Sequence, residues 1–146
     1  MEVSTLSKML MDGFEYEAWA NDQWLPIVPA LGETGEKIWT HMLKAHTLWY
    51  SRCLGEEELP PLSANVGDAL REMAGHWHDL LRICDPEAYV SYTTTTGETY
   101  MSLLEDIARH VVNHGTYHRG QLRMMAEEKG IAFPETDLIL WKRSQG

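Results

Sequence analysis

Residues 110–122 read HVVNHGTYHRGQL and lie within a longer stretch that has the spacing of an amphipathic helix. Side chains three and four residues apart share one face of an α-helix. An apolar stripe follows this spacing and passes through two histidines: Leu104, Ile107, Val111, His114, His118, Gln121 and Met125. His114 and His118 are therefore expected to face the protein core, where Leu or Ile would contribute more to stability.

Histidines one helical turn apart can converge on one metal ion, and this stretch offers two such pairs. His110 and His118 would lie about 12 Å apart along the helix axis, so all three histidines cannot bind the same ion. Because His110 lies on the flank of the apolar stripe, we favour His114 and His118 as the pair. The alternative is two buried histidines that neighbouring helices satisfy by hydrogen bonds. We favour a metal site because polar groups at adjacent inward positions usually form one in helical bundles.

A site between helices needs a ligand from a second helix, and the stretch 35–55 carries two candidates, His41 and His46. Each lies on a ridge of apolar residues that could face inward, so the spacing alone leaves both open. His76 and His78 are two residues apart and flank the apolar stripe of the next helix from opposite sides. We expect these two histidines to be ordinary half-exposed residues.

Four segments in all have helical spacing, and they predict an all-α fold, a four-helix bundle in a single domain of residues 1–146. The expected helices span residues 4–24, 35–55, 66–83 and 102–129. Asn65 is expected to cap the third helix, and Ser102 with Glu105 to form a capping box that starts the fourth. Gly55 and Gly130 are expected to end the second and fourth helices.

Two further segments lie outside the expected helices. A short hairpin-like insertion is expected before the last long helix, because β-branched and aromatic residues surround Thr96 and Gly97. The tail from residue 131 contains the apolar run Leu138–Trp141, which we expect to pack on the bundle as an irregular segment.

The chain is acidic, with 22 Asp and Glu against 12 Lys and Arg and a formal net charge of −10. Because nucleic acids are polyanions, we expect no nucleic-acid partner. No stretch approaches the roughly 18 uninterrupted apolar residues of a membrane span, and the N-terminus lacks the pattern of a signal peptide. Two cysteines, Cys53 and Cys84, are too few for a disulfide framework. We therefore expect a cytoplasmic protein with no membrane partner.

The stretch 110–122 resembles the signature of the DinB/YfiT-like family of metal-binding four-helix bundles, most closely in its HxxxHRGQ core. The segment THMLKAHTLWYSRCLG, residues 40–55, resembles the family's stretch in which a ligand histidine precedes a tryptophan by eight residues. That likeness places His41 in the ligand position ahead of Trp49, and His46 where the family often has an acidic residue. AWANDQWL and TDLILW are also similar to family segments, so the resemblance covers nearly the whole chain.

The resemblance implies one divalent metal ion held by His41, His114 and His118, with the rest of its coordination open to water or substrate. It also implies a homodimer. A small-molecule substrate is implied as well, since family members include S-transferases that use a low-molecular-weight thiol. Imidazole ligands accept Zn²⁺, Ni²⁺ or Fe²⁺ alike, so the identity of the metal stays open. A closed structural site would need a fourth ligand, for which His46 and Glu105 are the candidates.

Three neutral imidazoles leave a divalent ion its positive charge, which acidifies a bound water toward neutrality. The leading hypothesis is therefore a metal-dependent enzyme, of the thiol S-transferase or hydrolase type, that activates water or a low-molecular-weight thiol for attack on a small electrophile. The alternative is a non-catalytic metal-binding protein of a stress response. No carboxylate at a fixed offset from the histidines stands out as a general acid or base, which keeps that alternative open.

Five other residues near the histidines carry expectations of their own. Gly120 inside a helix costs about 1 kcal/mol relative to Ala, which suggests the close approach of another backbone or of a ligand. Gln121 is expected to donate to a metal-bound water or to a histidine's outer nitrogen. Arg119 is expected either to pair with a carboxylate on a neighbouring helix or to bind substrate. Asn21 and Trp24 of the first helix are expected to line the site.

Overall fold

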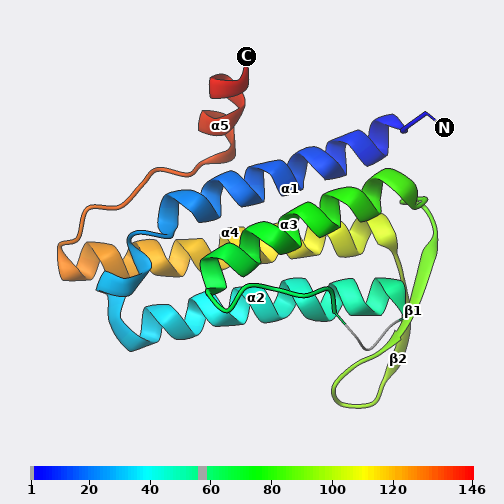
Figure 1. Cartoon of the computed structure of the whole chain (residues 1–146), viewed down its shortest axis with the longest axis horizontal. Helices are drawn as coiled ribbons and strands as arrows, with labels where there is room; N and C mark the ends of the chain where they lie inside the picture. The colour runs from blue at the N-terminus through cyan, green and yellow to red at the C-terminus, as the bar shows by residue number, and fades with distance from the viewer. Residues whose placement is uncertain (1, 56–58) are drawn as a thin grey trace.

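Four long helices make up most of the computed structural model, which describes residues 2–55 and 59–146 (Figure 1). Their bounds are Thr5–Trp24 for α1, Gly32–Leu54 for α2, Val66–Ile83 for α3 and Leu104–Lys129 for α4. A 3₁₀ turn, η1 (Val28–Leu31), joins α1 to α2. The all-α four-helix bundle predicted from the sequence is confirmed, and α2 begins at Gly32 rather than near Gly35.

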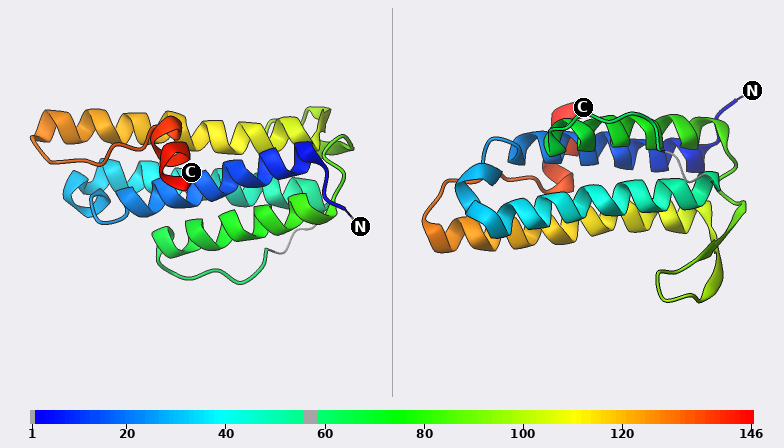
Figure 2. Two further views of the ribbon diagram at one scale, coloured as in Figure 1. Left: turned by 90° about the horizontal axis from the view of Figure 1, so that it is seen from above. Right: turned by 60° about the horizontal axis from the view of Figure 1, so that its bottom comes forward.

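The helices follow an order in which the first and last run parallel. In Figure 1, α1 and α4 run in one direction along the bundle and α2 and α3 run in the other. α1 packs against α3 and α4, and α2 packs against the same two helices, so α1 and α2 lie diagonally across the bundle. Residues 59–65 return along the bundle toward the end where α2 begins (Figure 2). This order places α2 beside α4, the two helices that carry the candidate ligands.

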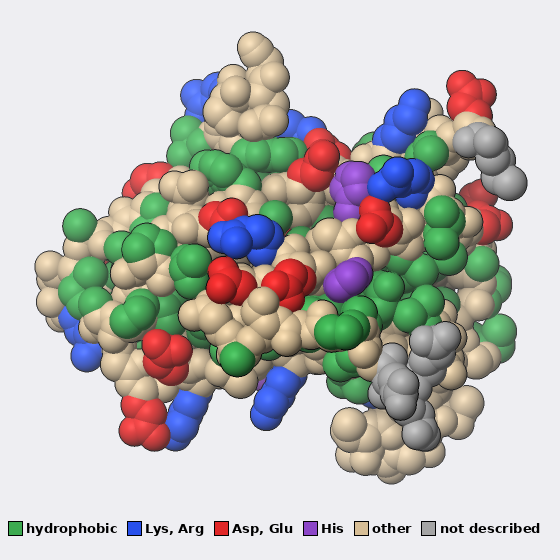
Figure 3. Space-filling view, in the orientation of Figure 1, with side chains coloured by type: hydrophobic (Ala, Val, Ile, Leu, Met, Phe, Trp, Pro, Cys, Tyr) green, Lys and Arg blue, Asp and Glu red, His purple; other side chains and the backbone are tan. Residues whose placement is uncertain are grey.

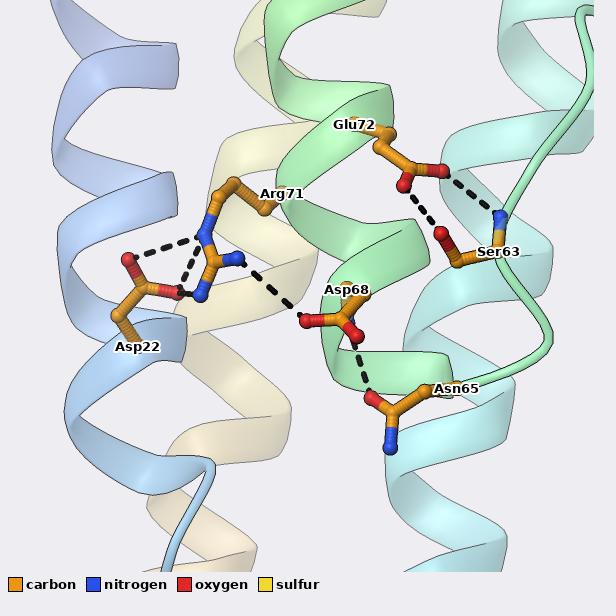
Figure 4. Close-up of polar contacts among 6 residues, drawn as sticks. All are labelled: Asp22, Ser63, Asn65, Asp68, Arg71 and Glu72. Atoms are coloured by element: carbon orange, nitrogen blue, oxygen red, sulfur yellow. Dashed lines mark hydrogen bonds and ion pairs between the residues drawn. The ribbon is translucent and has the colours of Figure 1, made fainter.

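Side chains and glycines mark several helix ends as the sequence predicts. The Asn65 side-chain oxygen accepts a 3.0 Å hydrogen bond from the backbone N–H of Asp68 and caps α3 (Figure 4). Gly55 and Gly130 end α2 and α4 in the left-handed conformation, with φ angles of 66° and 68°. That conformation is strained for a residue with a Cβ, so a glycine at each position allows the helix to stop there.

A two-stranded hairpin precedes α4, as predicted. β1 (Tyr89–Thr93) pairs antiparallel with β2 (Thr99–Leu103). The predicted capping box is wrong, because α4 begins at Leu104 and no side chain caps its N-terminus. Ser102 belongs to β2 instead, and its hydroxyl shares a 2.9 Å hydrogen bond with the Tyr92 hydroxyl. Strand pairing therefore takes up the residue that the sequence pattern assigned to the start of the helix.

The C-terminal segment crosses back over α1 and α4 after α4 ends (Figure 2). It ends in α5 (Leu138–Gln145), a helix where irregular structure was expected. The Tyr16 hydroxyl donates a 2.5 Å hydrogen bond to the backbone carbonyl of Thr136. The buried ring of Trp141 packs against Tyr16, with ring centroids 5.8 Å apart. Because Trp141 is the one buried side chain of α5, one face of a short helix is enough to anchor the segment.

Aromatic and aliphatic side chains fill the interior of the bundle. Phe14 and Trp77 stack with ring centroids 5.2 Å apart and join α1 to α3. Burial of such large apolar side chains provides most of the driving force for folding. On the surface of the same helix pair, Arg71 and Asp22 form an ion pair of 2.8 Å (Figure 4). Both side chains remain in contact with solvent, so this pair contributes at most about 1 kcal/mol.

Charged side chains of both signs are mixed on the face of the molecule that carries α1 and α3. Figure 3 shows acidic and basic residues interleaved over α1 and α3, with no continuous basic patch on this face. None of the helices in the described part of the chain is long and apolar enough to cross a membrane.

Candidate metal centre

Three histidines from two helices meet at the contact between α2 and α4. One side-chain nitrogen from each of His41, His114 and His118 lies within 4.8 Å of the other two. The Nε2 atoms of His114 and His118 are 3.1 Å apart, and the ring centroid of His41 is 4.7 Å from that of His118. Among the described residues, no other three His, Cys, Asp or Glu side chains converge in this way. The structure thus brings together the three residues that the family resemblance singled out.

The three histidine side chains differ in burial, from the interior of the bundle to its surface. His118 is buried, with 9% of its surface exposed, His114 is half buried and His41 is exposed. The predicted core-facing position therefore holds for His118, whereas His114 lies nearer the edge of the contact between α2 and α4. A molecule that approaches from solvent would meet the His41 side of the group first.

The surroundings of these imidazoles favour their neutral form. Burial lowers the pKa of His114 to about 4, and the neighbouring His118 and His41 add to the shift. Partial loss of water also lowers the pKa of His41, although the residue as a whole is exposed, and His118 and Lys44 lower it further. A neutral imidazole has a lone pair for a metal, whereas a protonated one has none. At neutral pH both rings are therefore in the state that metal binding requires.

Gln121 orients the ring of His118. Its side-chain oxygen lies 2.7 Å from His118 Nδ1 and accepts a hydrogen bond from it. With the proton on Nδ1, His118 directs the lone pair of Nε2 toward the other two rings. The sequence placed Gln121 beside a histidine's outer nitrogen, but as a donor, and the structure makes it the acceptor. Gln121 is exposed, so its predicted inward position is wrong.

A buried charged network crosses the centre of the bundle next to the histidine group. Glu17 of α1 is completely buried and forms an ion pair with Arg119 of α4. The other carboxylate oxygen of Glu17 lies 2.8 Å from Nε2 of His46 on α2. Asn21 of α1 accepts a further hydrogen bond from Arg119, at 2.8 Å. Arg119 therefore pairs with a carboxylate of a neighbouring helix, as predicted.

This network explains why His46 stands apart from the candidate ligands. Burial alone would raise the pKa of the Glu17 carboxyl, but Arg119 and His46 outweigh that effect and hold the pKa below its usual value. Glu17 is thus ionised at neutral pH and occupies one ring nitrogen of His46. Neither His46 nor Glu105, the two residues considered as a fourth ligand, belongs to the converging group.

Gly115, rather than Gly120, is the glycine of α4 that lies tightly against a side chain of another helix. A Cβ at position 115 would overlap the carboxylate of Glu17. Gly120 is exposed, and a Cβ there would meet nothing within 4 Å. No other backbone of the described residues therefore approaches Gly120 closely, and Gly115 is the glycine that makes room for the buried carboxylate. The sequence signal for this role was the position of Gly115, which lies between His114 and His118 on the helix predicted to face the core.

Asn21 and Trp24 do not line the histidine group, contrary to expectation. Asn21 bonds the buried arginine, and Trp24 donates a 3.4 Å hydrogen bond to the Thr136 hydroxyl on the C-terminal segment. Glu17 was missed by the sequence reasoning. The available signal was its spacing, because Glu17 lies three residues after Phe14 and four before Asn21, on the buried face of α1.

The remaining histidines and Cys53 are also accounted for. His110 is exposed, and its ring centroid lies 5.8 Å from that of His114. His76 and His78 are half buried on α3, which agrees with their expected character. Burial raises the pKa of the Cys53 thiol to about 12, so Cys53 does not supply a thiolate at neutral pH.

Comparison with known proteins assigns the chain to a family. A sequence model of the DinB family matches residues 1–145. Protein DinB of Bacillus subtilis (strain 168) is 36% identical over 61 residues, which are 42% of this chain and 30% of that protein. This alignment spans less than a third of the relative, whereas the family match spans nearly the whole chain. The resemblance found in the sequence is confirmed, and the chain belongs to the DinB family.

Proposed function

We propose that this chain is a metal-dependent enzyme in which His41, His114 and His118 bind one divalent metal ion. The proposal rests on one observation, the convergence of three imidazole nitrogens within 4.8 Å. No carboxylate, thiol or fourth imidazole of the described residues belongs to this group, which leaves coordination positions for water and substrate. The activity that we propose is activation of water or a low-molecular-weight thiol for attack on a small electrophile, as in a hydrolase or a thiol S-transferase.

The distances within the group suit an ion of the size of Zn²⁺. Tetrahedral nitrogen ligands about 2.1 Å from zinc are about 3.4 Å from one another. The Nε2 atoms of His114 and His118 are already 3.1 Å apart. His41 needs the larger adjustment, and its exposed side chain can rotate without disturbing the core. Ni²⁺ and Fe²⁺ accept the same ligands, so the proposal is for a divalent ion of any of these kinds.

Each histidine has a separate role in this proposal. His118 is oriented by its hydrogen bond to Gln121, which keeps the lone pair on Nε2. His114 has a pKa of about 4 and binds at neutral pH without first losing a proton. His41 lies on the solvent side and leaves space for a substrate beside it. A bound divalent ion with three neutral ligands would lower the pKa of a water or a thiol toward neutrality and so supply a nucleophile.

The metal content of the purified chain tests the site. Elemental mass spectrometry should find about one divalent ion per chain, retained in His76→Ala and lost in His118→Ala. His76 is a matched control because it is a half-buried histidine outside the group. Circular dichroism establishes that each variant is folded. Unchanged metal content in folded His118→Ala would overturn the site, and unchanged content in His41→Ala would remove His41 from it.

Turnover assays separate an enzyme from a non-catalytic protein. The metal-loaded chain is mixed with a low-molecular-weight thiol and a panel of small electrophiles, and thiol consumption is followed beside ester hydrolysis. We expect turnover that EDTA and His118→Ala both abolish. If the fully loaded chain turns over none of these substrates, the site is better explained by the alternative, a non-catalytic metal-binding protein of a stress response.

From the same family resemblance we propose a homodimer that acts in the cytoplasm on a small molecule. Sedimentation velocity of the full chain should then show a species of twice the mass of one chain. A monomer at all concentrations tested would exclude the dimer and leave the metal site unaffected.

A further inference from the structure

A cavity of about 600 Å³ lies between α1, α4 and the C-terminal segment. Its α4 wall includes Arg109, Val112 and Thr116. Since each residue turns the helix by about 100°, these three lie roughly half a turn around α4 from His114. The cavity therefore faces away from the histidine group. Its volume is within the range of small-molecule pockets, about 300 to 1,000 Å³.

The outer wall of this cavity is held in place by polar contacts. Tyr16 donates a 2.5 Å hydrogen bond to the carbonyl of Thr136, and Trp24 donates to the hydroxyl of the same residue at 3.4 Å. Further along the segment, Lys142 forms an ion pair with Asp12 of α1. The segment thus forms one side of an open hollow beside α4. A surface that binds a second protein is usually flatter and contributes about 800 Å² from each partner.

Apolar side chains line much of the hollow and leave part of their surface in solvent. Met9 and Leu10 of α1, Val112 of α4 and Leu138 of α5 all contribute to the wall. Met9 is 68% exposed and Leu138 is 51% exposed. Covering apolar surface of this kind is favourable in proportion to its area, so the hollow suits a ligand with a hydrocarbon part.

One arginine in the lining of the hollow has no ion-pair partner among the residues that the structure describes. Arg119 pairs with Glu17, and Arg123 pairs with Glu135 at 3.1 Å. Arg109 lines the same hollow but makes no hydrogen bond or ion pair with any residue in the described part of the chain. A guanidinium with free donors beside an apolar wall is suited to a carboxylate, which it can bind with two parallel hydrogen bonds.

Asp137 is the carboxylate that lines the hollow, and it lies at the end away from Arg109. Val112 is 3.6 Å from the position that a Cβ on Gly13 would take. α1 and α4 run parallel (Figure 1). Arg109 comes three residues before Val112, so it lies about one turn nearer the start of the two helices than this contact. Asp137 directly follows Thr136, the residue that Tyr16 bonds. Tyr16 comes three residues after Gly13, so Asp137 lies about one turn beyond the same contact, on the side away from Arg109. Asp137 therefore leaves the Arg109 end free for an anion.

We propose that this hollow binds an amphipathic monocarboxylate, such as a medium-chain fatty acid, with its carboxylate on Arg109 and its hydrocarbon chain along Met9, Val112 and Leu138. The guanidinium donates to the carboxylate, and the hydrocarbon chain covers apolar surface that is now in solvent. This site is separate from the histidine group and binds its ligand without a metal.

Isothermal titration of decanoate into the full chain, in the presence of EDTA, tests this binding. We expect saturable binding that Arg109→Gln weakens by about tenfold or more, because a charge-assisted contact is lost. Arg82→Gln is the matched control, since Arg82 is an exposed arginine of α3 that does not line the cavity. Decanol has no carboxylate and should bind the wild-type chain and Arg109→Gln equally.

A second pair of variants tests the apolar wall. Met9→Asp places a carboxylate in the hollow near Arg109 and should abolish decanoate binding. Met124→Asp makes the same change at an exposed methionine of α4 outside the cavity and should leave binding unchanged. Both side chains are exposed, so both variants should fold, as circular dichroism would establish.

Three results would overturn the proposal. One is no binding at millimolar decanoate, and another is equal binding by wild type, Arg109→Gln and Met9→Asp. The third is a dimer that Met9→Asp dissociates, because a second copy of the chain would then cover the hollow. His118→Ala should bind decanoate as the wild type does, so the failure of the metal site would not affect this test.

Discussion

We expect Glu17→Gln to destabilise the fold by about 3 to 5 kcal/mol, the usual effect of removing one partner of a buried ion pair. The substitution keeps the shape of the side chain and removes its charge. Arg119, which is 3% exposed, then keeps a positive charge in the interior without its counter-charge. His46 also loses the carboxylate that lies 2.8 Å from its Nε2.

The structure places the expected loss toward the lower end of that range. Arg119 retains hydrogen bonds to Asn21 at 2.8 Å and to Thr116 at 3.2 Å, which still satisfy part of the guanidinium. A loss of about 3 kcal/mol is a large part of the 5 to 15 kcal/mol that stabilises a typical domain. For a chain of this length it should lower the melting temperature by roughly 10 °C.

Urea unfolding followed by circular dichroism, in EDTA, measures the loss, and a double-mutant cycle isolates the pair. Arg119→Met should be destabilising alone, because the buried charge of Glu17 then loses its arginine and keeps only the contact with His46 Nε2 at 2.8 Å. The double variant should lose less than the sum of the two single losses by about 2 kcal/mol, since no charge is left unpaired. Arg71→Gln is the control at an exposed pair and should lose under about 1 kcal/mol. A Glu17→Gln loss as small as the control, or additive losses, would refute the reasoning.

Three further changes test other parts of the structure. Gly115→Ala should lose about 1 to 3 kcal/mol of stability because its Cβ overlaps Glu17, whereas Gly120→Ala in open space should gain about 0.5 to 1 kcal/mol, both measured by urea unfolding. The pKa of Glu17 is lower in the folded chain than its ordinary value of 4.5, so its ionised form stabilises the fold above that pH. This stabilisation is lost as the pH falls, and acid titration of Glu17→Gln should show a flatter stability profile. Trp141→Ala should release α5 from Tyr16, which faster amide exchange in residues 138–145 would reveal.

Local patterns predicted the helices because the interactions that end a helix involve a few neighbouring residues. Asn65 bonds a backbone N–H three residues away, and Gly130 acts through its own φ angle, so both can be read from the sequence. The capping box at Ser102 was wrong because a contact from another strand competes for the same residue. Tyr92 lies ten residues earlier, and its bond to Ser102 exists only once the hairpin has formed.

The candidate site was predictable only where one helix decides its geometry. His114 and His118 follow from spacing within α4, whereas the choice of His41 on α2 came from the family resemblance. The buried contact between Glu17 and His46 joins α1 to α2, which lie diagonally across the bundle. That meeting depends on the order of the helices in space, which the periodicity of a single helix does not determine.

Successive residues of a helix point about 100° apart, so the four residues HRGQ, 118–121, reach different surroundings. His118 faces α2, Arg119 crosses the centre of the bundle to Glu17 on α1, and Gly120 borders the hollow under the C-terminal segment. Gln121 turns back to hold the ring of His118. Arg119 directly follows His118 in the sequence. The buried pair of Arg119 and Glu17 therefore joins α4 to α1 at the level of the bundle where His118 contacts the ring of His41 on α2. The geometry of the histidine group therefore depends on a salt bridge that contributes no ligand to it.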